Sequence, residues 1–226
     1  MVSAIIVAAG KSERMGSKID KAFLSLGPEP VLAYSLRAFQ ECHNVHSIVL
    51  VVRNDKLSAA EGMVQMFGIS KIRSIIAGGA SRQSSVAAGL AAVDPDSEIV
   101  CVHDAARPCV TPALISETVG VARKYGSGVA ASKVTDTVKI VKKGHVVDST
   151  LDRDLIWTVQ TPQTFKYDIL IKAFESLKKS KDDVTDEATA VEKTGAEVRL
   201  VPCSFPNMKI TTPDDLPVAA LLMGIK

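Results

Sequence analysis

Short apolar runs rich in β-branched residues alternate along the chain with longer segments whose apolar residues recur at helical spacing. The apolar runs predict strands at Ala4–Ala8, Ser47–Val52, Ile72–Ile76, Ile99–His103 and Val129–Ser132. The segments between them predict helices at Val31–Glu41, Lys56–Phe67, Gln83–Val93 and Pro112–Tyr125. This alternation predicts an α/β fold, in which a mainly parallel sheet is buried by helices on both faces.

The alternation breaks near Lys133. From Val134 to Val159, Thr and Val residues surround a Lys142-Lys143-Gly144 turn, which predicts a β-hairpin or arm in place of another strand–helix unit. Such an excursion can pack on a partner subunit or on the edge of its own sheet, and the pattern leaves both open. Beyond it we expect helices at Asp168–Lys178 and Asp186–Thr194, strands around Val198–Val201 and Met208–Ile210, and a last helix with Thr212 as its N-cap.

Composition limits the class of protein but does not identify its function. The 226 residues are 46% apolar, which suits one domain over residues 1–226 with an arm inserted at about 134–160. The net charge of +2 argues against a nucleic-acid partner, and no apolar stretch is long enough to predict a membrane span. The cysteines include no Cys-x-x-Cys pair, so neither zinc nor redox spacing is present. We therefore expect reduced thiols and a cytoplasmic protein.

The first predicted strand ends in Ala9-Gly10, and four basic residues follow: Lys11, Arg14, Lys18 and Lys21. In open parallel sheets, ligands bind at the carboxyl ends of the strands. The loop fits neither the P-loop motif nor the G-x-G-x-x-G dinucleotide motif. A glycine turn followed by Arg14 and Lys21 predicts a site for a polyphosphate. The alternative interpretation is a solvated loop, which would include Lys11 and Lys18.

Two later motifs also follow predicted strands. In GGASRQSSVAAGL (Gly78–Leu90), the two glycines could let a planar base reach the main chain, with Ser85 offering a hydroxyl; a simple turn and helix cap is the alternative. In IVCVHDAARPCV (Ile99–Val110), Asp104 suits either a Mg²⁺ shell or a substrate hydroxyl. Arg107 could instead merely neutralise Asp104. For His103 we expect a structural position without a role in chemistry.

These motifs also carry a resemblance. AAGKSERMG, with a lysine downstream, is similar to the signature loop of sugar-nucleotide pyrophosphorylases and cytidylyltransferases. HDAARPC resembles the 2-C-methyl-D-erythritol 4-phosphate cytidylyltransferase family of the non-mevalonate isoprenoid pathway. Across essentially the whole chain, VTDTVK, DR-x-x-x-W, QTPQTF, TDEA and NMKIT match that family in order. The resemblance implies a Rossmann-like sheet with a protruding β-arm for dimerisation.

The resemblance also implies a reaction, namely transfer of CMP from CTP to 2-C-methyl-D-erythritol 4-phosphate with release of pyrophosphate. The residues implied in catalysis or in gripping the acceptor's phosphate are Arg14, Lys21, Arg153 and Lys209. Those implied to contact the nucleotide are Ala8, Ala9, Gly10, Gly79 and Ser85. Those implied to hold the acceptor are Asp104, Arg107, Thr137 and Thr161. Mg²⁺ would be held mainly through the CTP phosphates, with no protein residue assigned as a metal ligand.

In the family, the arm that carries the counterparts of Thr137 and Arg153 comes from the other subunit, which implies a homodimer. Three positions depart from the family's usual pattern: Ser12, Asp20 and Ala80. Two alternatives remain, a ribitol 5-phosphate cytidylyltransferase and a non-catalytic nucleotide-binding regulatory protein. A third, a dinucleotide-dependent oxidoreductase, conflicts with the missing G-x-G-x-x-G motif.

Overall fold

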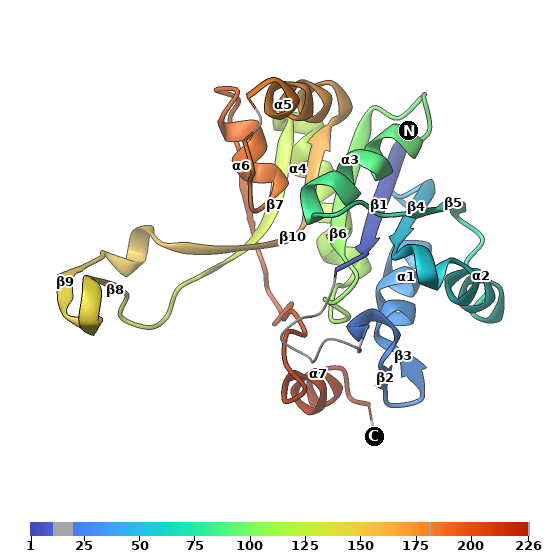
Figure 1. Ribbon diagram of the computed structural model, residues 1–226, viewed down its shortest axis with the longest axis horizontal. Helices are drawn as coiled ribbons and strands as arrows, with labels where there is room; N and C mark the ends of the chain where they lie inside the picture. Colours follow the sequence, from blue (N-terminus) through green and yellow to red (C-terminus); the bar gives the residue numbers. More distant parts are fainter. Residues whose placement is uncertain (11–19, 181, 226) are drawn as a thin grey trace.

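A computed structural model describes residues 1–10, 20–180 and 182–225 of the chain (Figure 1). Within these residues, seven strands form a central sheet in the order β11-β7-β10-β6-β1-β4-β5. β10 runs antiparallel to its neighbours β6 and β7, and the other neighbouring strands are parallel. The predicted mainly parallel sheet is confirmed. The strands are β1 Val2–Ala8, β4 Ser47–Val52, β5 Ile72–Ala77, β6 Ile99–Asp104, β7 Ser127–Lys133, β10 Trp157–Lys166 and β11 Leu200–Pro202.

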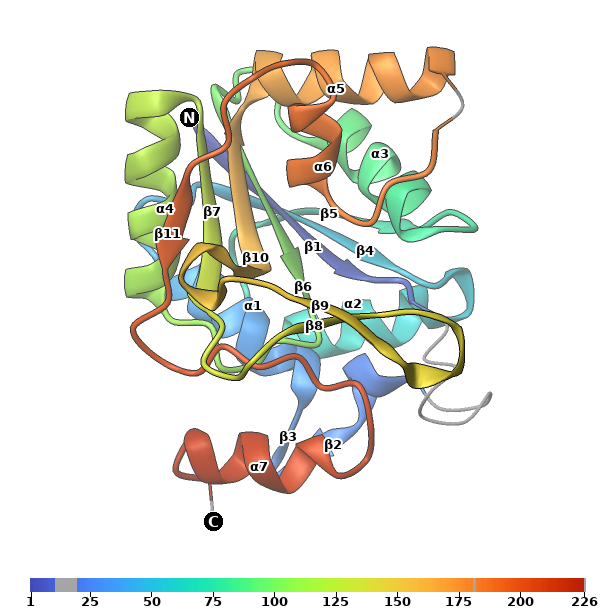
Figure 2. The same cartoon turned by 90° about the vertical axis from the view of Figure 1, so that its left-hand side faces the viewer.

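Helices cover both faces of this sheet (Figures 1 and 2). Alternate residues of β1 serve the two faces, with Ile6 in one buried cluster and Ile5 in the other. The first cluster includes residues of α1 Val31–Glu41, α2 Leu57–Met66 and α4 Pro112–Tyr125. The second includes residues of α3 Arg82–Ala92, α5 Tyr167–Ser180 and α6 Glu187–Glu192. Burial on both faces explains why these strands read as nearly continuous apolar runs.

A smaller cluster lies beside the sheet, where Leu26 and Ile210 are buried against the last helix. Two predictions fail here. Met208–Ile210 is not a strand, although Ile210 donates its N–H to the carbonyl of Ala106 at 2.8 Å. Thr212 is not the N-cap, because α7 begins at Asp215. The Asp215 carboxylate instead accepts the N–H groups of Thr211 and Thr212, which lower its pKa to about 2. The elements here are β2 Ser25–Leu26, β3 Glu29–Pro30 and α7 Asp215–Leu222.

Strand β10 was not predicted, although it is the longest strand in the described chain and lies in the middle of the sheet. Its sequence, WTVQTPQTFK, lacks a continuous apolar run and contains Pro162, which argues against a central strand. The register shifts between Val159 and Gln163, around this proline. The buried Thr161, Gln163 and Thr164 have hydrogen-bonded side chains, so polar residues occupy the sheet interior without loss of partners.

The predicted arm is present and projects from the body of the molecule (Figure 1). Its strands, β8 Lys139–Val141 and β9 Val147–Thr150, pair with each other in a separate two-stranded sheet. The turn η4 Lys143–His145 contains Gly144 at φ 79°, and η5 Arg153–Leu155 follows. The arm ends before the predicted boundary near 160, because β10 starts at Trp157. The hairpin is not paired with the edge of the central sheet, because β8 and β9 form a sheet of their own. None of the described helices has both the length and the apolar character of a membrane span.

Candidate active site

A cavity of about 800 Å³ opens at the carboxyl ends of β1, β4, β5 and β6. Parallel neighbours end on the same side of a sheet, so the loops that follow them meet there. Its volume suits a ligand of nucleotide size. The described residues that line it include Ala8, Ala9, Gly10, Asp20, Lys21, Arg53, Asp55, Gly79, Ser85, Asp104 and Lys209. Residues far apart in the sequence therefore converge on one cavity, at the edge of the sheet where the sequence predicted a site.

The two glycines after β5 are required by close approach. A Cβ at Gly78 would lie 2.4 Å from the Cβ of Ala9, and one at Gly79 would lie 2.3 Å from the Oγ of Ser84. Ser85 braces the same turn, because its Oγ accepts the N–H of Gly79 at 3.1 Å and donates to the carbonyl of Ser81 at 2.8 Å. Ser81 is also the N-cap of α3. The segment thus forms a turn and a helix cap, and the same turn lines the cavity.

A smaller cavity of about 310 Å³ adjoins the first and is also lined by Arg82, Asp104 and Lys209. Arg107 and Thr161, both predicted to hold the acceptor, line the smaller cavity. The three shared side chains therefore stand at the junction of the two spaces. This arrangement brings two predicted groups together, the nucleotide-contacting residues on one side and acceptor-contacting residues on the other.

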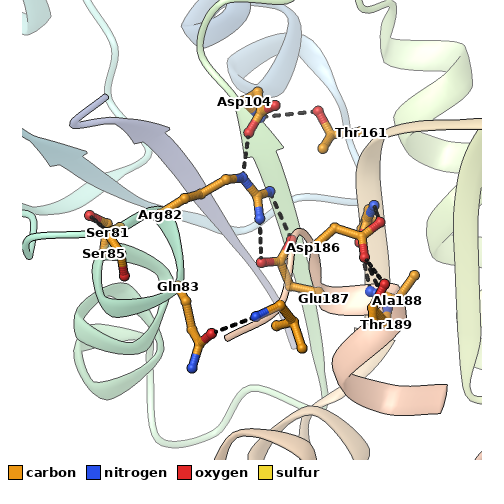
Figure 3. Close-up of polar contacts among 12 residues, drawn as sticks. Ser81, Arg82, Gln83, Ser85, Asp104, Thr161, Asp186, Glu187, Ala188 and Thr189 are labelled. Carbon is orange, nitrogen blue, oxygen red and sulfur yellow. Dashed lines mark hydrogen bonds and ion pairs between the residues drawn. The ribbon is translucent and has the colours of Figure 1, made fainter. Parts of the chain in front are cut away.

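Asp104, at the end of β6, is held by two cations. Its Oδ1 accepts from Nε of Arg82 at 3.0 Å (Figure 3). Its Oδ2 accepts from Nζ of Lys209 at 2.5 Å. Burial acts to raise the pKa of the Asp104 carboxyl, but Arg82 and Lys209 outweigh it and hold that pKa below its usual range. The carboxylate is therefore charged at neutral pH, with both oxygens directed at N–H donors.

Arg107 is not an ion-pair partner of Asp104 in the described chain, although its charge adds to those of Arg82 and Lys209 in lowering the pKa of the Asp104 carboxyl. Its NH1 donates to the carbonyl of Asn207 at 2.8 Å, while the carboxylate of Asp104 contacts Arg82 and Lys209. Burial lowers the pKa of Arg107. Its Nε has no hydrogen-bond partner among the described residues. A basic side chain with spare donors in the smaller cavity suits an anionic ligand.

His103 has the structural position that was expected. The ring is fully buried, packs against Phe39, and hydrogen-bonds through Nδ1 to Oγ1 of Thr161 at 3.1 Å. Burial lowers its pKa to about 3, so the ring is neutral. The Thr161 hydroxyl also accepts the N–H of Asp104 at 3.0 Å. Thr161 therefore positions Asp104 from the main-chain side, besides lining the smaller cavity.

Some predicted site residues are not brought to the cavities. Thr137 and Arg153 lie exposed on the arm, and neither lines a cavity of the described chain. Arg153 instead donates from NH1 to the carbonyl of Thr135 at 2.9 Å. Lys21, the first residue of η2 Lys21–Phe23, does line the larger cavity. Arg14 and Ser12 lie outside the described residues.

Two charged residues at this site were missed by sequence reasoning. Arg82 donates from NH1 and NH2 to the two carboxylate oxygens of Glu187, at 2.7 and 2.9 Å (Figure 3). Glu187 is 1% exposed. Both residues belong to motifs that were quoted, GGASR and TDEA, yet they are 105 positions apart. Only the fold brings them together, so spacing along the chain gave no signal.

The described residues offer no group of three or more His, Cys, Asp or Glu side chains that could hold a metal ion. The carboxylates that line the larger cavity are those of Asp20, Asp55 and Asp104. Asp55 pairs with Arg53 and Asp104 with two cations, whereas Oδ2 of the buried Asp20 has no partner among the described residues. This set fits a cation that brings most of its ligands with a bound polyphosphate.

The open sheet, the cavity at its carboxyl edge and the basic residues there define a class, the α/β nucleotide-binding proteins that handle phosphate groups. A family model described as 2-C-methyl-D-erythritol 4-phosphate cytidylyltransferase matches residues 2–224. The chain belongs to the 2-C-methyl-D-erythritol 4-phosphate cytidylyltransferase family. The resemblance found in the sequence motifs is thereby confirmed, and it is favoured over the ribitol and regulatory alternatives.

Individual relatives agree with this family. Proteins named 2-C-methyl-D-erythritol 4-phosphate cytidylyltransferase include one from Clostridium novyi (strain NT), 40% identical over 99% of this chain and 97% of its own length. Another, from Alkaliphilus oremlandii (strain OhILAs), is 39% identical over 96% of this chain and 92% of its own. The solved 4-diphosphocytidyl-2C-methyl-D-erythritol synthase from Anaerococcus prevotii DSM 20548 matches with a TM-score of 0.87 and 31% identity, covering 99% of this chain and 96% of that one.

Proposed function

We propose that this chain transfers CMP from CTP to 2-C-methyl-D-erythritol 4-phosphate, giving 4-diphosphocytidyl-2-C-methyl-D-erythritol and pyrophosphate. Family membership carries the reaction. The two adjoining cavities support a reaction between two bound substrates, because a nucleotide-sized cavity meets a smaller one at Arg82, Asp104 and Lys209. In this proposal CTP occupies the larger cavity and the acceptor the smaller, so that the reacting phosphates meet at the shared basic side chains.

The chemistry asks the protein for positioning and charge neutralisation. An oxygen of the acceptor's phosphate attacks the α-phosphorus of CTP, a new P–O bond forms, and the bond to pyrophosphate breaks. The phosphate nucleophile is already ionised at neutral pH, so no general base is needed. His103 precedes Asp104 in β6, and its ring is neutral and fully buried. This is in keeping with a mechanism that needs no general base.

Within the proposal, Lys21 and Arg14 stabilise the negative charge that grows on the α-phosphate. Ala8, Ala9 and Gly10 contact the nucleotide through the main chain, and the Gly79–Ser85 turn contacts the base. Lys209, Arg107 and Asp104 act on the acceptor. Mg²⁺ would supply charge neutralisation of the triphosphate and would be held mainly through the CTP phosphates, in the cavity that Asp20 also lines.

The arm completes the proposal with a homodimer, in which Thr137 and Arg153 of one subunit act at the site of the other. Its exposed apolar side chains, which need cover, support this assignment: Ile140, Val141, Val146, Val147 and Leu155. A cytoplasmic location is proposed as well. It is supported by the cysteines, all free, three of them buried.

Pyrophosphate release from CTP and Mg²⁺ tests the function, with 2-C-methyl-D-erythritol 4-phosphate and ribitol 5-phosphate supplied in parallel. We expect release with the first acceptor alone. Release with ribitol 5-phosphate alone would keep the chemistry and overturn the acceptor. CTP binding without release from either would support the regulatory alternative.

A variant in the same assay tests the proposed machinery. Lys21→Ala should lower turnover by about 10²-fold or more, because it removes a positive charge placed for the transition state. Lys172→Ala, which removes an exposed lysine of α5, is the matched control and should retain activity. Near-normal turnover in Lys21→Ala would remove Lys21 from the mechanism.

A further inference from the structure

A cluster of four charged side chains, Glu187, Arg82, Asp104 and Lys209, joins α6 to both cavities. Figure 3 shows Arg82 between Asp104 and Glu187. We propose that Glu187 is a positioning residue for acceptor binding, which acts through Arg82 on Asp104 and Lys209. This inference rests on the proposed function and adds a residue to it. Glu187 lines neither of the two cavities, so any effect it has on a ligand must pass through the side chains it contacts.

The contacts run in one line from α6 to the junction of the cavities. Glu187 accepts two hydrogen bonds from the guanidinium of Arg82, at 2.7 and 2.9 Å. The Nε of Arg82 points the other way and donates to Asp104 at 3.0 Å. Asp104 in turn accepts from Lys209 on its second oxygen. A bidentate contact fixes the plane of a guanidinium, so Glu187 determines how Arg82 presents Nε to Asp104.

Charge balance gives Glu187 a second effect. The cluster holds two cations and two anions, and Arg82 divides its donors between two carboxylates. If Glu187 lost its charge, Asp104 would be the remaining ion-pair partner of Arg82 among the described residues. The guanidinium would then turn its paired N–H groups toward Asp104 and compete with Lys209. Glu187 therefore keeps the Asp104–Lys209 pair intact at the junction of the two cavities, where an acceptor with hydroxyl groups and a phosphate would meet it.

The neighbouring structure fixes Glu187 in place. Gln163 of β10 accepts the N–H of Ala188 through Oε1 at 2.9 Å and donates from Nε2 to Asp186 at 2.9 Å. From the other side, Oε1 of Gln83 accepts the N–H of Val184 at 3.1 Å (Figure 3). The start of α6 is thus tied both to the central sheet and to α3. A carboxylate held this firmly can orient a long arginine side chain.

A substitution of Glu187 should weaken binding of the acceptor more than binding of CTP. The larger cavity has many lining groups away from the cluster, including the main chain at Ala8–Gly10 and the turn at Gly78–Ser81. The smaller cavity takes its described positive charge from Arg82, Lys209 and Arg107, two of which belong to the cluster. The KM for the acceptor is therefore the sensitive readout, and the KM for CTP is the internal reference.

Steady-state kinetics on Glu187→Gln tests the inference in the full-length protein. We expect the KM for 2-C-methyl-D-erythritol 4-phosphate to rise about 10-fold or more, as for a lost charged hydrogen bond, with the KM for CTP within about 2-fold. Glu187→Asp keeps the charge and should recover part of the loss. Lys193→Gln removes an exposed ion pair with Asp182 next to α6 and should behave as the wild type.

The double variant Arg82→Lys/Glu187→Gln shows whether Glu187 acts through Arg82. If it does, the double variant should be within about 2-fold of Arg82→Lys alone, because the path is already broken. Independent, multiplying losses would overturn the inference, as would an unchanged acceptor KM or equal losses for both substrates.

A wild type without turnover would overturn the proposed function and this inference with it. A normal wild type with an unaffected Glu187→Gln would overturn the inference alone. If Glu187→Gln does not fold, Glu187→Asp with Arg82→Lys provides the same cycle.

Discussion

Thr161 connects the main chain of Asp104 to the ring of His103. The Nε2 of His103 lies 3.3 Å from the carbonyl oxygen of Arg107, which can only accept a hydrogen bond, so Nε2 carries the proton. Nδ1 is then an acceptor, and the Thr161 hydroxyl donates to it while accepting the N–H of Asp104. A neutral histidine thereby determines the direction of a hydroxyl that positions Asp104. Protonation of His103 would break this arrangement.

His103 should make the free energy of unfolding depend on pH in the mildly acidic range. Its pKa is about 3 in the folded protein against an ordinary 6.5, so the unfolded chain binds the proton more readily. The contribution to stability is complete above pH 6.5 and is lost as the pH falls toward 3. Between pH 7 and pH 5 we expect the advantage of the wild type over His103→Gln to shrink by about 2 kcal/mol.

Urea unfolding of both proteins at pH 7, 6 and 5 measures this difference. The comparison removes the effect of the other titrating groups, which the two proteins share. Curves that change in parallel with pH would mean that the ring does not remain neutral in the folded protein.

At the scale of the element, the arm presents Arg153 on η5, exposed and held by its contact with the carbonyl of Thr135. Arg153→Ala should raise the KM for the sugar phosphate about 10-fold or more while leaving the KM for CTP within about 2-fold. The proposed reason is that a guanidinium that grips the acceptor's phosphate is lost. Lys143→Ala, which removes an exposed cation at the tip of the arm, serves as the control. Equal losses for the two substrates would contradict this division of roles.

The elements differ in how far sequence alone could predict them. Ser47–Val52 was predicted with the bounds it has, because a continuous apolar run matches a strand buried on both faces. β10 could not be predicted in the same way, since three of its buried side chains, Thr161, Gln163 and Thr164, are polar and find their hydrogen-bond partners elsewhere in the chain. The predicted strand at Met208–Ile210 failed because Ile210 is buried there from a segment without strand pairing, next to the half-buried Met208 and Lys209.

The site shows the same limit. Residues that follow strands, such as Gly79 and Asp104, were found because strand ends meet at one edge of a parallel sheet. Glu187 follows no strand and contacts no cavity, and its partner is 105 residues away. The arm residues Thr137 and Arg153 were assigned from the resemblance alone, and a single chain does not bring them to its own cavities.

For the whole molecule, the arrangement of one chain separates the cavity residues from the arm residue Arg153, and this separation bears on the proposed dimer. Its cavities are lined by Lys21 and Lys209, while Arg153 belongs to η5 of the arm. The arm projects from the body of the molecule (Figure 1). In a symmetric dimer each site would combine the body of one subunit with the arm of the other. Variants of the body and of the arm should then complement each other, which variants of a self-contained site cannot do.

Mixed dimers of Lys21→Ala and Arg153→Ala subunits test this prediction. With equal amounts and random exchange, about half of the dimers contain one subunit of each kind. One site of such a dimer has both substitutions, and the other has the native body and the native arm. The mixture should therefore recover about a quarter of the wild-type activity, measured as pyrophosphate release after co-refolding or co-expression. Activity that stays at the average of the two parent variants would place Arg153 and Lys21 in the same subunit's site. Lys21→Ala mixed with Lys21→Ala/Arg153→Ala is the matched control, because no combination of these subunits contains a native body.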